Sequence, residues 1–281
     1  MIDFILLQFM KLMPTHMISR LIGDLASRPF SKGVIPLFTR VFKIPVEEAE
    51  KTPEQYGSLN DFFTRKLKED VRPMDMDPQS IVSPADGRVA AFGEIREGQL
   101  IQAKGVFFTI WNLLGIPKEE TDRFEGGRFI TIYLSPRDYH RVHTPVEGEI
   151  TDYSYLPGTL FPVNSFGVRA VKGLFAKNER LVSFIQSSKA GRVAVVKVGA
   201  TIVGSVKVGY SKEAGTNVKA GRLIHQKLTP PHPIERGQEI GFFQFGSTVV
   251  LAFEQGKMEF VSNLQEGQPI KMGETIGRCI S

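Results

Sequence analysis

One serine stands where an apolar strand is expected. The run from Glu239 to Phe253 is rich in Ile, Phe, Val and Leu, but Gly246-Ser247-Thr248 interrupts it. A serine hydroxyl can attack the carbonyl of the preceding residue, and a glycine there offers little steric hindrance. The Gly246–Ser247 peptide bond would then be a reactant, and the chain would be cut in two. The alternative is a tight turn between two strands, because Gly and Ser are common turn residues.

Two of the five histidines, His140 and His143, lie three residues apart. They occupy a polar segment between an apolar run and Pro145. Catalytic groups often lie in such loops. Histidine titrates near neutral pH and is the usual general acid or base. Both residues could equally be ordinary surface positions of a loop, so the pattern alone leaves the two interpretations open.

An aspartate completes a possible catalytic set. Asp86 precedes a glycine, and an Asp-Gly pair is typical of a turn. Together with a histidine and Ser247, however, it supplies the members of a Ser/His/Asp relay, in which the aspartate orients the imidazole and the imidazole removes the serine proton. A serine hydrolase would use the same relay (Ser247, His143 and Asp86) on an external ester. Against this alternative, Ser247 lacks the Gly-x-Ser-x-Gly elbow of the α/β-hydrolases.

Two regions must position these side chains. Residues 1 to about 70 are predicted to form short helices punctuated by prolines, with Ser58 as the N-cap of a helix over 59–67. From Ile81 onward the pattern changes to short β-rich runs with Gly and Pro turns. Two segments, 234–241 and 265–277, resemble the turn-and-strand pattern of lipoyl- and biotinyl-type domains. We therefore predict an α+β fold, with a helical region 1–70 and a β-rich domain 71–281 of β-sandwich or barrel character.

The composition narrows the function classes. The chain has 281 residues, a formal net charge of +5 and a single cysteine, so an internal disulfide is impossible. No Cys/His cluster has the spacing of a structural zinc site, and no metal is expected. The basic pI of about 9.2 could suit a nucleic-acid binder. The excess charge lies on apolar helices, however, rather than in a basic groove with aromatic residues, so no nucleic-acid partner is predicted.

The N-terminal segment combines apolar and basic character. Residues 1–45 contain six basic and two acidic residues among many Ile, Leu, Met and Phe. The apolar stretch is too short and too often interrupted to span a bilayer. Helices with apolar and basic faces suit the surface of an anionic membrane, although packing on the protein's own core or on a partner subunit is the alternative. A second apolar stretch, 104–115, contains the only tryptophan, Trp111, and is either a membrane-facing lip or a core helix.

Taken together, the motifs resemble those of the phosphatidylserine decarboxylase family, in its short bacterial proenzyme form. The similarity extends from about Ser58 to the C-terminus, and more loosely over the N-terminal helices. It is carried by segments 59–65, 83–87, 139–143, 157–164, 175–180, 198–200 with 203–205, and 245–248. One departure is Phe245, where the family usually has leucine before Gly-Ser-Thr.

The resemblance implies a chemistry for these residues. Ser247 would attack the Gly246 carbonyl, with Asp86 and His143 serving this self-cleavage. The serine residue would then be converted into a covalent pyruvoyl group, which is an electron sink for decarboxylation. Phosphatidylserine would form a Schiff base with this group, lose CO₂ and leave as phosphatidylethanolamine. His140 would serve the decarboxylation.

The resemblance also implies an assembly and a location. The β chain, residues 1–246, and the α chain, residues 247–281, would stay interlocked in one fold, and the protein would be a homodimer. Phe161 and Asn164 would line the pocket for the lipid headgroup. The substrate places the protein peripherally on the cytoplasmic face of the cell membrane, where the N-terminal helices would meet anionic lipid.

Overall fold

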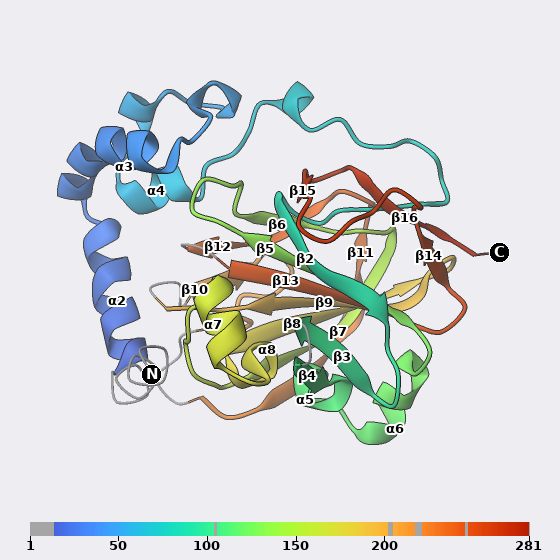
Figure 1. Cartoon of the computed structure of the whole chain (residues 1–281). Helices are drawn as coiled ribbons and strands as arrows, with labels where there is room; N and C mark the ends of the chain where they lie inside the picture. Colours follow the sequence, from blue (N-terminus) through green and yellow to red (C-terminus); the bar gives the residue numbers. More distant parts are fainter. Residues whose placement is uncertain (1–13, 104–105, 202–204, 217–220, 245–246, 281) are drawn as a thin grey trace.

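Helices dominate the first part of the chain and strands the remainder (Figure 1). The computed structural model describes residues 14–103, 106–201, 205–216, 221–244 and 247–280. Its helices, with η for 3-10 helices, are α2 (Thr15–Ala26), η1 (Pro29–Val34), α3 (Ile35–Phe42), η2 (Val46–Glu48), η3 (Pro53–Gln55), α4 (Leu59–Phe63), η4 (Glu69–Val71), α5 (Ile110–Leu114), α6 (Lys118–Thr121), η5 (Asp122–Phe124), α7 (Ser165–Ala170) and α8 (Leu174–Lys177). Its strands are β1 (Ser80–Val82), β2 (Gly87–Glu94), β3 (Gln99–Ala103), β4 (Val106–Thr109), β5 (Arg128–Leu134), β6 (Arg141–His143), β7 (Gly148–Leu156), β8 (Arg180–Ser187), β9 (Gly191–Val198), β10 (Ser205–Val208), β11 (Ile224–Ile234), β12 (Glu239–Gln244), β13 (Ser247–Phe253), β14 (Met258–Phe260), β15 (Pro269–Ile270) and β16 (Thr275–Cys279).

The predicted α+β class is confirmed, since short helices precede a β-rich region. The lipoyl-like detail of that prediction is not confirmed. The predicted cap is present, because the Ser58 hydroxyl accepts a hydrogen bond from the amide of Asp61 at 3.1 Å. The helix ends at Phe63 rather than at residue 67. The chain turns there because the buried Arg65 donates to the carbonyls of Arg137 and Asp138, a tertiary contact that overrides helix propensity.

An eight-stranded antiparallel sheet forms the centre of the molecule, in the order β11-β7-β8-β9-β13-β5-β2-β15. Strand β13 lies in its interior and pairs with β5 on one side and β9 on the other. In this register Ser247 lies opposite Leu134, and Thr248 lies between Tyr133 and Val198. All seven residues of β13 are buried. The strand that begins with Ser247 is therefore among the most enclosed in the fold.

The apolar run from Glu239 to Phe253 forms two strands in different sheets. Its first part, β12, belongs to a three-stranded sheet of order β10-β12-β6, whereas β13 belongs to the central sheet. Residues 245–246 lie between them, outside the described residues. The change of sheet at this point explains why small residues interrupt an otherwise strand-like pattern. It also brings β6, which carries His143, beside β12, where His143 lies opposite Glu239.

The helical region is packed against the strands. Arg141 on β6 donates to the carbonyl of Thr64 at 2.7 Å and pairs with Glu239. Phe63 is buried in the main hydrophobic core together with residues of the central sheet. The division into units 1–70 and 71–281 stays a prediction, and the contacts show that the helices and the strands share a core.

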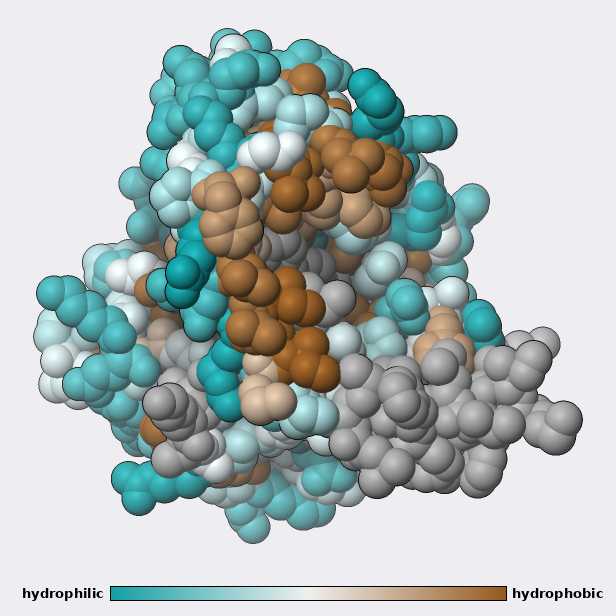
Figure 2. Space-filling view, turned by 90° about the vertical axis from the view of Figure 1, so that its left-hand side faces the viewer, coloured by the Kyte–Doolittle hydropathy of each residue, from teal (hydrophilic) through white to brown (hydrophobic). Residues whose placement is uncertain are grey.

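One face of the first helices is apolar and exposed, and we call it the N-terminal apolar face. It consists of Met17, Leu21, Leu25, Phe30, Val34, Leu37 and Val41, each between 43% and 66% exposed. Figure 2 shows hydrophobic residues gathered in a band over this side of the molecule. Four exposed basic residues belong to the same segment, namely Arg28, Lys32, Arg40 and Lys43. Within the described part of the chain, no helix is long and apolar enough to cross a membrane.

Candidate active site

Ser247 combines complete burial with an unpartnered hydroxyl. Its side chain is 0% exposed, and its Oγ has no hydrogen-bond partner among the described residues. A buried polar group without a partner costs free energy, about 1–3 kcal/mol, so such groups are rare and often functional. The predicted partner in the reaction, Gly246, lies outside the described residues. The start of β13 therefore places a hydroxyl oxygen, which can act as a nucleophile, in apolar surroundings.

His140 lies at the same corner of the central sheet as Ser247. Its Nε2 is 3.0 Å from the carbonyl oxygen of Ser135, which directly follows Leu134, the residue opposite Ser247. Its own carbonyl accepts a hydrogen bond from the amide of Phe243 on β12. Its ring stacks on Phe63 with centroids 4.1 Å apart. The helical region and both sheets therefore hold this imidazole in place.

The protonation of His140 follows from these contacts. Complete burial, helped by the nearby charge of Arg65, lowers its pKa to about 3, so the ring is neutral at neutral pH. A carbonyl can only accept, so Nε2 carries the proton. The other nitrogen, Nδ1, is buried with no partner among the described residues. This leaves a lone pair available to take up a proton.

His143 is fixed in the opposite tautomer. Its Nδ1 lies 2.8 Å from the carbonyl oxygen of Gly237 and must donate to it. Its Nε2 lies 3.3 Å from the hydroxyl of Tyr139, which can donate to the free lone pair. Burial lowers the pKa of His143, against the opposing effect of the Gly237 contact, and favours the neutral ring. Both histidines are thus neutral bases with defined orientations.

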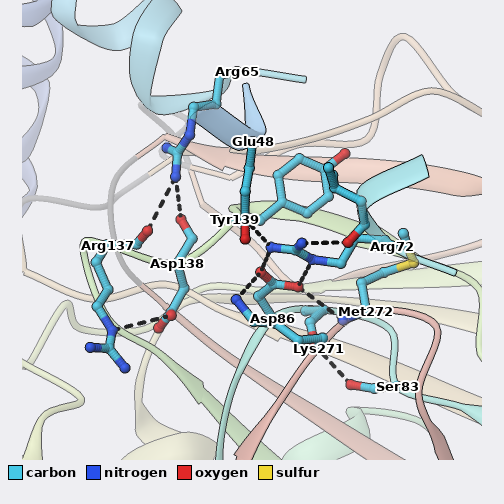
Figure 3. Close-up of polar contacts among 12 residues, drawn as sticks. Glu48, Arg65, Arg72, Ser83, Asp86, Arg137, Asp138, Tyr139, Lys271 and Met272 are labelled. Atoms are coloured by element: carbon cyan, nitrogen blue, oxygen red, sulfur yellow. Dashed lines mark hydrogen bonds and ion pairs between the residues drawn. The ribbon is translucent and has the colours of Figure 1, made fainter. Parts of the chain in front are cut away.

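Asp86 is held by an ion-pair cluster (Figure 3). Its carboxylate, 1% exposed in a cavity of about 260 Å³, accepts two hydrogen bonds from Arg72 at 2.5 and 2.9 Å and one from the amide of Met272 at 2.9 Å. Arg72 also pairs with Glu48 at 2.6 Å, and Lys271 lies 3.5 Å from Asp86. These bonds stabilise an ionised carboxylate in a buried place.

The members of the predicted relay are not hydrogen-bonded to one another, although a backbone hydrogen bond joins His143 to a residue near Asp86. The amide of His143 donates to the carbonyl of Pro84 at 2.8 Å, so β6 is anchored two residues from Asp86. Within the described residues, however, the Asp86 carboxylate bonds to Arg72, the His143 ring bonds to Gly237, and the Ser247 hydroxyl has no partner. Direct transfer along a relay therefore requires Asp86 and His143 to exchange partners, and the roles of these residues stay predictions.

The two predicted headgroup residues lie in one loop and have structural contacts of their own. The backbone amide and carbonyl of Phe161 are bonded to the side chain of Asn178 at 3.0 and 2.8 Å. The exposed Asn164 caps α7 by accepting from the amide of Gly167 at 3.1 Å. Their role in substrate binding stays a prediction. Asn178 holds this loop and was not singled out from the sequence.

Other residues of the site were also missed from the sequence. Arg72, which binds Asp86, marked only the end of the helical region in the sequence pattern. Arg65 and the carbonyl of Gly237 carried no local signal of their roles, since each acts through a contact between distant segments. Tyr139 lies only four residues from His143, which it contacts. No group of acidic, histidine or cysteine side chains in the described residues could hold a metal ion.

Comparison with known proteins identifies the class. The family model described as "Phosphatidylserine decarboxylase" matches residues 59–278, and the chain belongs to this family. Among its relatives named "Phosphatidylserine decarboxylase proenzyme", that of Brevibacillus brevis is 46% identical and the alignment covers 94% of each chain. Those of Myxococcus xanthus and Shewanella baltica are each 40% identical, with alignments covering 98% of each chain and 96% and 94%, respectively.

We predict that His140 gains no proton between pH 8 and pH 5, and that His143 gains one only below its ordinary pKa, because burial disfavours the charged ring. Nitrogen-15 NMR of the uncut Ser247→Ala chain should show His140 as the Nε2–H tautomer and His143 as the Nδ1–H tautomer. An unfolded chain takes up these protons near pH 6.5, so His140 should reduce folding stability as the pH falls from there toward about 3. His140→Gln and His143→Gln assign the signals, and titration of either ring near its ordinary pKa would contradict the assignment.

Proposed function

We propose that this protein is a phosphatidylserine decarboxylase made as a precursor that cuts itself between Gly246 and Ser247. The observation that carries the proposal is the Ser247 hydroxyl, which is fully buried and without a partner among the described residues at the start of a central strand. The family membership of the chain supports it. The Ser247 hydroxyl belongs to one of the two residues joined by the Gly246–Ser247 peptide bond, so it is suited to a reaction within the chain.

Up to its last step, the proposed cleavage needs no reactant other than the chain itself. Ser247 Oγ adds to the Gly246 carbonyl carbon, and the peptide bond becomes an ester as the nitrogen takes up a proton. Loss of the Ser247 α-proton then breaks the bond from Cβ to Oγ and releases the upstream chain as the Gly246 carboxylate. Tautomerisation and addition of water to residue 247 release ammonia and leave a pyruvoyl group there.

The fold would hold both products together. The segment after the cut supplies β13, which pairs with β5 and β9, and β15, which pairs with β2. It also supplies β16, which lies between β1 and β14. The proposed α chain, 247–281, is thus bonded into sheets whose other strands come mostly from residues 1–246. Cutting one peptide bond leaves these ladders and their apolar contacts in place.

His143 is the proposed base for the cleavage, with Asp86 as its partner. The Gly237 carbonyl accepts a hydrogen bond from Nδ1–H of His143, so Nε2 is the atom that would accept a proton. For Asp86 to assist directly, it must exchange Arg72 for the imidazole. Direct assistance by Asp86 would therefore require this exchange of partners.

A pyruvoyl group at residue 247 fits its surroundings, because the orphaned hydroxyl would leave with Gly246 and the serine Cβ would become a methyl group in a buried, apolar place, with the new carbonyl at Cα. Such a group supplies an electrophilic carbonyl that draws away the electrons left when CO₂ departs. His140 is proposed to serve this step, and its buried Nδ1, which carries a lone pair, is the atom that would hold or move the proton. Phe161 and Asn164 are proposed to face the lipid headgroup.

The N-terminal apolar face is proposed to dock on the cytoplasmic surface of the cell membrane (Figure 2). Apolar side chains would enter the headgroup region while Arg28, Lys32, Arg40 and Lys43 meet anionic lipid. Phosphatidylserine is itself such a lipid, so docking and substrate supply coincide. A homodimer is the proposed assembly. No observation favours the serine hydrolase alternative, whereas the family membership of the chain supports the decarboxylase.

The self-cleavage is tested by intact mass. Purified protein should give two chains divided after Gly246, the smaller with a blocked N-terminus, whereas Ser247→Ala should remain one chain of 31.3 kDa. The matched control is Thr248→Val, which removes the neighbouring buried hydroxyl, also without a described partner, but keeps the side-chain shape. This control should still be cut. A wild-type chain that stays whole would refute the proposal.

The two histidines should separate the two reactions. His143→Ala should leave the chain uncut, because the proposed base is lost. His140→Ala should be cut but release no CO₂ from phosphatidylserine, because the second proton-transfer group is missing. Denaturing gels report the first reaction and CO₂ release the second, while thermal melts establish that each variant is folded. Cleavage by His143→Ala would reverse the assigned roles.

Membrane docking is tested on the apolar face. A buried leucine side chain contributes about 1.5–3 kcal/mol, so Leu21→Glu/Leu37→Glu should bind anionic vesicles at least about tenfold more weakly while still cutting itself. Met76→Glu is the matched control, since Met76 is 77% exposed but lies outside this face. Vesicle flotation measures the binding. Equal flotation of the double variant and the wild type would exclude this face as the docking surface.

A further inference from the structure

A second hollow lies among α5, α8, β4 and the end of β7, and we call it the α5–α8 pocket. It has a volume of about 680 Å³, within the range of small-molecule sites. In Figure 1, α8 lies beside β8, and β4 and α5 lie just below them. Its lining shares no residue with that of the cavity beside Asp86.

The pocket carries positive charge without compensation. None of the described residues that line it is acidic, whereas Lys172, Lys177 and Arg180 are basic. Arg180 is 3% exposed and donates only to carbonyl oxygens, those of Leu113, Asn112 and Asn178. Burial lowers its pKa to about 9, and none of the described carboxylates pairs with it. A buried cation bonded only to neutral groups favours a nearby anion.

The mouth of the pocket is apolar. Phe107, Trp111 and Leu223 line it and are 49%, 38% and 54% exposed, which is unusual for large apolar side chains clustered together. The Trp111 ring packs over Gly98, where an added β-carbon would lie 2.3 Å from the ring. The indole is therefore held in position at the pocket, and apolar lining continues inward to Leu156.

The pocket is on the other face of the central sheet from the Ser247 side chain. Arg180, Val198 and Thr248 are side by side in adjacent strands, so their side chains share one face. Ser247 precedes Thr248 and points to the opposite face. Two strand spacings separate Arg180 from Thr248, roughly 10 Å. The pocket is thus near the site in the sheet but is not part of the cavity that surrounds the reacting hydroxyl.

We propose that the α5–α8 pocket binds an anionic amphiphile, a phosphate ester attached to alkyl chains. The phosphate would meet Lys172 and Lys177, with the buried charge of Arg180 behind them. An alkyl chain would cover Phe107, Trp111 and Leu156. Neither ligand half alone accounts for the lining of the pocket. A simple anion leaves the aromatic mouth exposed, and a neutral lipid brings no anion to Lys172, Lys177 and Arg180.

The test uses the single tryptophan of the chain, because all tryptophan emission comes from Trp111. Monomeric dihexanoylphosphatidylglycerol should shift the emission to shorter wavelength and saturate. Dihexanoylphosphatidylcholine, with the same chains but no net charge, and glycerol 3-phosphate, with the charge but no chains, should each bind at least about tenfold more weakly. This readout requires neither self-cleavage nor decarboxylation, so it fails or succeeds independently of the proposed function.

Variants distinguish binding in the pocket from a general attraction of the anionic lipid to positive charge. Lys172→Glu/Lys177→Glu should weaken the anionic lipid at least about tenfold, and Ala176→Phe should block it by filling the pocket while keeping both lysines. Lys212→Glu/Lys257→Glu makes the same charge change at exposed positions outside the lining and should bind like the wild type. The proposal is overturned by equal binding of either control ligand, by unchanged binding in the lysine variant, or by emission that depends on protein concentration without lipid, which would assign the pocket to a second copy of the chain.

Discussion

The hydrogen bonding of β13 on both sides is the constraint on which the rest of the structure depends. A strand that begins with Ser247 and pairs with both β5 and β9 cannot leave the sheet without breaking two ladders. Its seven buried residues add apolar contacts on both faces. A chain break placed immediately before such a strand is tolerable, because the hydrogen bonds to β5 and β9 would hold the new end without a covalent connection.

Charge in the site is distributed so that the reacting region is neutral and its border is charged. His140 and His143 are kept uncharged by burial, each with its proton held by a carbonyl. The carboxylate of Asp86 is instead matched by Arg72, which Glu48 also contacts. An anion bonded in this way is stable but is not free to assist an imidazole. The Asp86 carboxylate and the His143 imidazole thus lie in separate hydrogen-bond networks.

Local sequence signals predicted the helices and strands better than they predicted the tertiary contacts. The Ser58 cap, the β-rich character after residue 80 and the oddity of Ser247 were all evident from residue types, because capping, alternation and polarity act over a few residues. The separation of β12 and β13 into different sheets was not evident, since both halves of the run are equally apolar. Nor was the burial of Lys197, whose amine is 2.6 Å from the hydroxyl of Ser183 on the next strand. Such pairings depend on strand register, which one sequence does not display.

The helical region links the exposed apolar face to the chemistry. Phe63 from α4 stacks on His140, Arg65 holds the carbonyls of residues 137 and 138, and Glu48 contacts Arg72. These residues belong to the same segment as α2 and α3, whose outer faces carry the exposed Leu21 and Leu37. A surface built on these helices is therefore joined to the site by buried contacts rather than by a flexible linker. In the proposed docking of this face on a membrane, the arrangement would fix the distance between the bilayer and residue 247, so that the lipid would not have to be withdrawn far from the membrane.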